Sequence, residues 1–325
     1  MLHILNGSSI EEPLRQSSVP GEFFSFRDAL IDGPVIAGLD KEQWRQLRVE
    51  HLSSTYGVEP HTCDEQFLEQ TQALESYSTH DEVVLWFEHD LFCQLNLLYL
   101  LDWFAHIDLA GTKLSLVHIG EFPGRENFRG LGELNEKELA SLFPHRQTVS
   151  ATQLELASEA WRGFSSPDPT SLESILNTDT SSFPFLDTAL AAHLRRFPNT
   201  TNGLGQIENT SLELVGNGRV QFGDLFPEFI AAEPVYGLGD AQLWLSLVNL
   251  SKANEPLLTT YAENNPSQVS PKAFFKITEA GKAVLNGESD FVKLNGVDQW
   301  LGGVHLEGFD RLWRWDNEMA RLKYC

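Results

Sequence analysis

A short apolar run that ends in three titratable residues constrains this chain most. Residues 83–87 read Val-Val-Leu-Trp-Phe, and Glu88, His89 and Asp90 follow directly. A run of β-branched and aromatic residues predicts a strand buried on both faces, which is typical of a parallel sheet covered by helices. Ligands of such sheets bind just beyond the carboxyl ends of the strands. We therefore predict that Glu88, His89 and Asp90 belong to a functional site. The alternative is a polar strand end in which Asp90 caps a helix over residues 91–104.

The first half of the chain alternates between strand and helix patterns. The strand candidates are Leu2–Leu5, Glu22–Phe26, Val83–Phe87 and Lys113–Ile119, and the helix candidates are Lys41–Ser54, Asp64–Ser76 and Gln94–Ala105. Such alternation implies crossover connections and a mainly parallel sheet with helices over it. We predict that residues 1–150 form an α/β domain, Rossmann-like or flavodoxin-like.

The second half has a different pattern. Residues 151–183, which contain the loop Ser165-Ser-Pro-Asp-Pro169, are predicted to be a helical linker. Residues 184–325 are predicted to form a mainly α domain with a Trp-rich carboxyl-terminal segment that packs on the rest of the fold. The expected elements are helices over Leu186–Arg196, Phe222–Ala232 and Ala241–Leu250, a strand over Phe274–Thr278 and a helix over Glu279–Leu285.

One stretch of this half carries a family likeness. Thr278-Glu-Ala-Gly281-Lys-Ala-Val284-Leu285 resembles the Thr-x-x-Gly-x-x-Val-Leu stretch that follows a strand in winged helix-turn-helix domains. The resemblance implies a winged helix-like fold for residues 184–325 and says little of function.

The charge of the chain excludes some partners. The formal net charge is −23, and acidic residues outnumber basic ones in both halves. The helix expected at 241–250 contains no Lys or Arg. Because phosphate contacts need several basic side chains, we expect neither DNA binding nor association with an anionic membrane. A small-molecule ligand or a protein partner remains compatible with this charge.

The three cysteines indicate the compartment. Cys63, Cys93 and Cys325 are odd in number and form no Cys-x-x-Cys pair. This pattern is typical of a reducing environment. The amino terminus has no basic stretch followed by a long apolar run, so we expect a cytoplasmic protein.

Further polar segments follow the other predicted strands. Asn6-Gly7-Ser8-Ser9 could present amides and hydroxyls to an anion, or could be a turn with a Ser N-cap. Asp28, followed by the turn at 32–34, could orient an imidazole, ligate a cation or bind a ribose, or could be a capping residue. If the strands are parallel, all these segments meet at one edge of the sheet.

A glycine-rich loop after the last predicted strand carries two arginines. Glu121 opens this loop, and Arg125 and Arg129 lie within it. The arginines could hold a phosphate or carboxylate of a substrate, or could pair with acidic surface residues. One imidazole among carboxylates suits a divalent cation such as Mg or Mn better than a structural zinc.

Scattered motifs resemble a bacterial family known only as a domain of unknown function. They are His3-Ile-Leu-Asn-Gly7, Asp28 with Gly33-Pro34, Trp86-Phe-Glu-His-Asp90 with Gln94-Leu95, Gly130-Leu-Gly132, Asn202-Gly-Leu204 and Trp300-Leu-Gly-Gly303. The resemblance spans nearly the whole chain and implies no known reaction. Members often carry Asp where this chain has Ser8, which removes one carboxylate from the predicted edge.

Two classes of function follow. The first is an enzyme, a hydrolase or transferase, that uses His89 as general acid or base. In it Asp28 or Asp90 orients the imidazole or binds a cation, and the amino-terminal loop holds a phosphate-bearing or nucleotide-like molecule. The second is a regulatory or adaptor protein whose winged domain contacts another protein.

Overall fold

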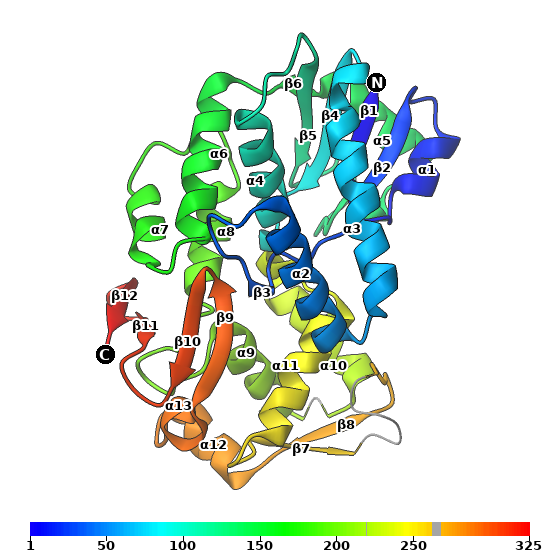
Figure 1. Ribbon diagram of the computed structural model, residues 1–325. Helices are drawn as coiled ribbons and strands as arrows, with labels where there is room; N and C mark the ends of the chain where they lie inside the picture. Colours follow the sequence, from blue (N-terminus) through cyan, green and yellow to red (C-terminus); the bar gives the residue numbers. More distant parts are fainter. Residues whose placement is uncertain (219, 262–267) are drawn as a thin grey trace.

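The main sheet of the protein is mostly parallel, as predicted. A computed structural model describes residues 1–218, 220–261 and 268–325 (Figure 1). The sheet has the order β2-β1-β4-β5-β6, in which β6 alone is antiparallel. Its strands are β1 (Leu2–Asn6), β2 (Glu22–Phe26), β4 (Glu82–Glu88), β5 (Lys113–Ile119) and β6 (Gln147–Thr148). All four predicted strands are therefore confirmed, and the fold is mixed α/β.

Strand β4 is buried on both faces because its side chains enter two separate cores. Val83, Leu85 and Phe87 join one hydrophobic cluster, whereas Val84 and Trp86 join the other, and all five are fully buried. The Trp86 indole Nε1 donates to His3 Nδ1 at 3.0 Å, so its buried polar atom is satisfied. Residues 83–87 are all apolar because both faces of β4 are buried, as the sequence predicts.

Helices cover both faces of this sheet. The smaller cluster packs under α1 (Glu11–Gln16) and α5 (Glu136–Leu142). The larger cluster packs under α3 (Pro60–Glu75), α4 (Leu91–Ala105) and α6 (Ala151–Phe164), while α2 (Lys41–Tyr56) packs against α3. The remaining short elements of the first half of the chain are β3 (Gly33–Pro34), η1 (Ser76–Thr79), η2 (Leu131–Glu133) and η3 (Phe143–His145). Helix α6, predicted as part of a linker, packs closely against α4.

Helices dominate the chain between residues 170 and 285. They are α7 (Thr170–Ile175), α8 (Leu186–Leu194), α9 (Gln206–Gly216), α10 (Phe222–Ala232), η4 (Pro234–Tyr236), α11 (Asp240–Lys252) and α12 (Glu279–Leu285), with a hairpin of β7 (Leu258–Tyr261) and β8 (Phe274–Ile277). The predicted Thr278 stretch begins α12, where Thr278 Oγ1 accepts the Gly281 amide at 2.9 Å. Helix α9 was not predicted, because its sequence between Gly205 and Gly216 is mostly polar and its few apolar residues do not show a clear helical period.

The end of the chain corrects the expectation of a mainly α second half. After α13 (Phe291–Asn295) come two antiparallel hairpins, β9 (Val297–Gly302) with β10 (Val304–Gly308), and β11 (Trp313–Asp316) with β12 (Arg321–Tyr324). Strand β9 also pairs in parallel with β3 from the first half. These strands were not predicted, because short segments that alternate between apolar and polar residues indicate strands less clearly than the preceding segments indicate helices.

The two halves share one hydrophobic core. A single cluster of buried side chains includes Leu2 at one end of the chain and Leu322 at the other. The boundaries predicted at residues 151 and 183 remain a prediction. No helix among the described residues is both long and apolar enough to cross a membrane.

Candidate functional site

The carboxyl edge of the main sheet has a topological switch point between β1 and β4. From β1 the chain order continues outward to β2 on one side, and to β4 and β5 on the other. In open α/β sheets, ligands bind outside the carboxyl ends of the strands at this point. Asn6 ends β1 and Glu88 ends β4, so both lie at this edge. Asp28, His89 and Glu121 follow their parallel strands at the same edge.

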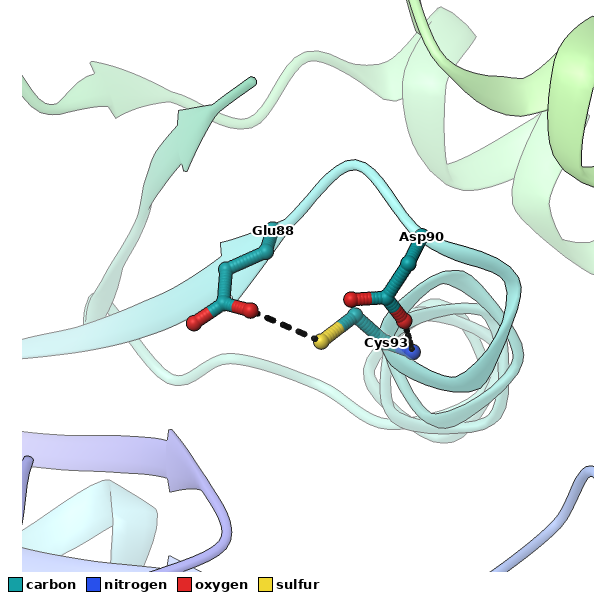
Figure 2. Close-up of side chains that lie close together, drawn as sticks. All are labelled: Glu88, Asp90 and Cys93. Carbon is teal, nitrogen blue, oxygen red and sulfur yellow. Dashed lines mark hydrogen bonds between the residues drawn. The ribbon is translucent and has the colours of Figure 1, made fainter. Parts of the chain in front are cut away.

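Three side chains at the end of β4 form what we call the strand-end cluster: Glu88, Asp90 and Cys93. One oxygen of each carboxylate and the Cys93 Sγ all lie within 4.8 Å of one another (Figure 2). The Cys93 thiol donates to Glu88 Oε2 at 3.6 Å, and the Cys93 amide donates to Asp90 Oδ1 at 2.8 Å. The second contact makes Asp90 the N-cap of α4, the alternative weighed from the sequence. Cys93 was not predicted, although its place in the first helical turn puts it beside the N-cap.

Two glycine loops cover the carboxylates of the strand-end cluster. The Leu131 amide donates to Glu88 Oε1 at 2.6 Å, and a Cβ on Gly130 would lie 2.4 Å from Glu88 Oε2. On the other side, a Cβ on Gly237 would lie 2.2 Å from Asp90 Oδ1. Residues far apart in the chain therefore enclose this cluster, and only backbone without a side chain fits there.

The strand-end cluster concentrates negative charge in a buried place. Burial raises the pKa of Glu88 to about 7, and the neighbouring Asp90 adds to the shift. Burial also raises the pKa of Asp90 and holds the pKa of the Cys93 thiol well above its usual range. In the described part of the chain, no Lys or Arg forms an ion pair with either carboxylate. The cluster must therefore hold protons or a cation.

Replacing Glu88 by Gln should remove a pH dependence of stability in metal-free protein. The folded pKa of about 7 exceeds the ordinary 4.5, so folding takes up a proton between these values. The wild type therefore loses stability as pH rises through this window, and Glu88→Gln does not. From about pH 4.5 to about pH 8 the variant should gain up to about 3 kcal/mol relative to the wild type. Urea unfolding in EDTA measures the difference; parallel pH profiles would contradict the assignment.

His89 lies beside a second imidazole. Its Nδ1 is buried without a hydrogen-bond partner among the described residues, and both His89 and His118 contact the Phe185 ring. The Gln94 amide lies 2.7 Å from His118 Nε2 and donates to the Glu88 carbonyl at 2.5 Å. Burial, with His89 nearby, lowers the pKa of His118 to about 4. His118 is therefore neutral at pH 7.

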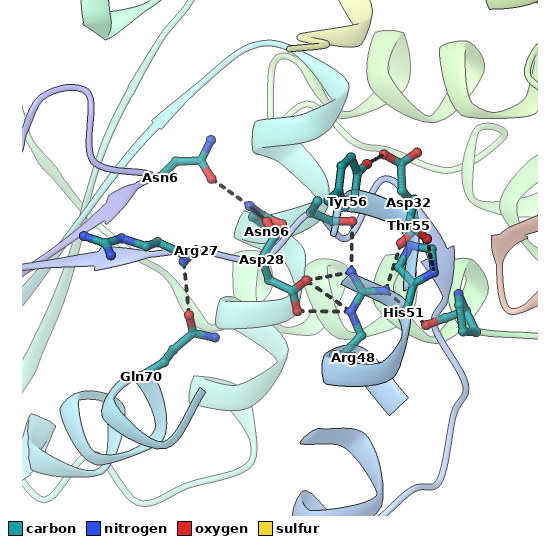
Figure 3. A network of polar contacts seen from close by, with 12 residues as sticks. Asn6, Arg27, Asp28, Asp32, Arg48, His51, Thr55, Tyr56, Gln70 and Asn96 are labelled. Carbon is teal, nitrogen blue, oxygen red and sulfur yellow. Dashed lines mark hydrogen bonds and ion pairs between the residues drawn. The ribbon is translucent and has the colours of Figure 1, made fainter. Parts of the chain in front are cut away.

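Asp28 is engaged in a buried ion pair. Its carboxylate accepts Arg48 Nη2 at 2.6 Å, and both side chains are almost fully buried. The Asp28 carbonyl accepts the Asn96 amide at 2.9 Å, and Asn96 in turn donates to Asn6 Oδ1 at 2.8 Å (Figure 3). Asn6 Nδ2 lies 2.7 Å from Cys93 Sγ. Asp28 is thus the middle of a network that positions the strand-end cluster, and its carboxylate is already paired.

The predicted anion-binding loop has no free positive charge. Ser8 and Ser9 are exposed, the Gly7 amide donates to the Phe26 carbonyl, and no serine caps α1. Helix α1 begins with Glu11 and Glu12, whose charges repel an anion at that helix end. The residue at the N-cap position of α1 is Ile10, so the alternative of a Ser N-cap is wrong.

The arginines of the glycine-rich loop are paired at the surface. Arg125 binds Glu138 at 2.9 Å and Arg129 binds Glu133 at 3.1 Å. Glu121 is exposed. These contacts match the surface pairing that was weighed against a substrate role.

Comparison with known proteins adds no further assignment. No family model matches the chain, and no relative was found among the curated proteins. The resemblance to the bacterial family therefore stays a prediction.

Proposed function

We propose that the protein is a metal-dependent hydrolase or transferase that acts on a phosphate-bearing or nucleotide-like small molecule at the strand-end cluster. One observation carries the proposal. The half-buried Glu88 carboxylate, the buried Asp90 carboxylate and the Cys93 thiol gather within 4.8 Å at the switch point of the sheet, without a basic partner among the described residues. We further propose a flavodoxin-like topology, because the four parallel strands, numbered along the chain, lie in the order 2-1-3-4.

A divalent cation would offset the negative charges of the strand-end cluster. It would neutralise Glu88, Asp90 and the Cys93 thiolate, which otherwise repel one another in a buried place. The sulfur moves the expected metal from Mg or Mn toward a softer ion such as zinc. Three protein ligands leave room for water or a substrate oxygen. A reducing, cytoplasmic location fits this proposal, because Cys93 must remain a free thiol.

The cation also accounts for the predicted class of substrate. Arg125 and Arg129 are paired, and α1 starts with carboxylates, so the glycine-rich loop and the start of α1 offer a phosphate little positive charge. A bound metal would supply that charge and orient the phosphate oxygens. His89, next to the cluster, would then move a proton to or from the reacting group.

The variant His89→Ala should separate ligand binding from folding. A melting-temperature screen of nucleotides with zinc or manganese should find compounds that stabilise the wild type only when metal is present. His89→Ala should lose this ligand-dependent shift and keep the melting temperature of the free protein. The exposed His145→Ala is the matched control and should behave as the wild type. A large drop in melting temperature with an unchanged ligand shift would show a purely structural His89.

A second candidate function is that of an adaptor with a winged helix-like module. The order α9, α10, α11, β7, β8 supports it, together with a short bridge between Gln221 and Phe274 that takes the place of the first strand. On helix α11, Gln242, Ser246 and Asn249 line a half-open cavity beside α2 and β9. That placement, and the lack of basic residues before Lys252, argue against DNA as the partner. Tight, salt-sensitive binding in a mobility-shift assay would contradict this view.

A further inference from the structure

A second candidate site lies away from the strand-end cluster. A half-open cavity of about 540 Å³, which we call the α2–α11 cavity, is lined by α2, α9, α11 and β9. Its volume falls within the range of small-molecule sites. A neighbouring cavity of about 460 Å³ shares part of its lining. The shared residues are Glu208, Ser246, Asn249, Asp298 and Gln299.

The lining of the α2–α11 cavity is negatively charged. Asp32, Glu208 and Asp298 contribute carboxylates. The guanidinium of Arg196 is occupied, since it donates to the Ile31 carbonyl at 2.7 Å and to Asp32 at 3.3 Å. One arginine therefore faces three acids, and a phosphate or carboxylate ligand would be repelled.

Glu208 is the acid without a cationic partner. Ser246 Oγ donates to its Oε1 at 3.3 Å, and no Lys or Arg in the described ranges forms an ion pair with it. Burial raises the pKa of this carboxyl, although Arg196 nearby opposes the shift. A half-buried carboxylate that has no ion-pair partner gains most from a ligand that brings its own positive charge.

The other walls suit the same ligand. Burial and Arg48 lower the pKa of His51 to about 4, so this imidazole is neutral. Its Nδ1 lies 3.3 Å from Thr55 Oγ1, while its buried Nε2 has no partner among the described residues (Figure 3). Trp300 is fixed by stacking on His305, with ring centroids 4.4 Å apart. A neutral imidazole does not repel a cation, and an indole face attracts one.

We propose that the α2–α11 cavity binds an organic cation, a small molecule that carries one or more amines, with Glu208 as its counter-ion. The site is separate from the metal and phosphate chemistry proposed at the strand-end cluster.

Calorimetric titration of the full chain with putrescine, spermidine and agmatine tests the proposal. EDTA in the buffer keeps divalent metals out of the measurement. At least one amine should bind and raise the melting temperature, whereas butanediol and succinate, of the same chain length as putrescine, should not. Glu208→Gln should weaken amine binding about tenfold or more, since a charge-assisted hydrogen bond is lost.

Two further variants keep the test decisive. Glu213→Gln removes an exposed carboxylate from the same helix and should leave affinity unchanged. Asn249→Lys places a positive charge at an exposed lining position, so it should weaken amine binding even if Glu208→Gln folds poorly. The proposal is overturned if no amine binds, if butanediol or succinate binds equally well, or if the folded variants at 208 and 249 keep wild-type affinity.

Discussion

Arg48→Ala is expected to lower the free energy of unfolding by about 3–5 kcal/mol. The guanidinium is fully buried, binds Asp28 and also donates to the carbonyls of Asp32 at 2.8 Å and Ala29 at 3.0 Å. Alanine would leave the buried Asp28 carboxylate without its ion-pair partner and remove the bonds to both carbonyls, although the Ala29 carbonyl still accepts the Asp32 amide at 2.9 Å. Urea unfolding at neutral pH measures the loss.

Two comparisons show whether the ion pair causes this effect. Arg45→Ala on the same helix removes a surface pair with Glu42 and should cost much less. The double variant Arg48→Ala with Asp28→Ala should lose less than the sum of the two single variants, because no uncompensated charge remains. Equal losses for Arg45→Ala and Arg48→Ala would contradict the buried network.

Gly237→Ala is expected to destabilise the protein by about 2–5 kcal/mol. Its φ of +63° is left-handed, which costs a residue with a Cβ roughly 1–2 kcal/mol. The new Cβ would also lie 2.2 Å from Asp90 Oδ1, and such overpacking adds about 1–3 kcal/mol. Thermal and urea unfolding both report the loss.

Gly57→Ala is the matched control for this variant. Gly57 has a φ of +69°, and a Cβ there would meet nothing within 4 Å. It should therefore show the backbone cost alone. If the two alanine variants lose the same stability, the loop at residue 237 does not lie on Asp90, and the proposed enclosure of the strand-end cluster is wrong.

Local patterns explain why much of the fold could be predicted. The β-branched run at 83–87 and the alternation of strands with helices identify the parallel sheet, and the sheet direction then gathers Asn6 and Glu88 at one edge. The capping role of Asp90 was also visible, because Asp precedes a long apolar helix.

The features that could not be predicted from the sequence depend on contacts between distant segments of the chain. Cys93 lies inside an apolar helix and looks like an ordinary core residue, until Glu88 is seen 3.6 Å from its sulfur. The contact of Gly237 with Asp90 joins residues far apart in the chain, and so does the pairing of β3 with β9. The α2–α11 cavity depends on both halves and leaves no motif in either.

The central claim is that Glu88, Asp90 and Cys93 together bind a divalent cation. Cobalt titration of metal-free protein, in a Cys325→Ser background that removes the exposed thiol, tests it most directly. We predict a thiolate-to-cobalt charge-transfer band that saturates with one ion per chain and is lost in Cys93→Ser. Cys63→Ser, which removes the other buried thiol, should keep the band. Absence of the band, or its persistence in Cys93→Ser, would contradict the account.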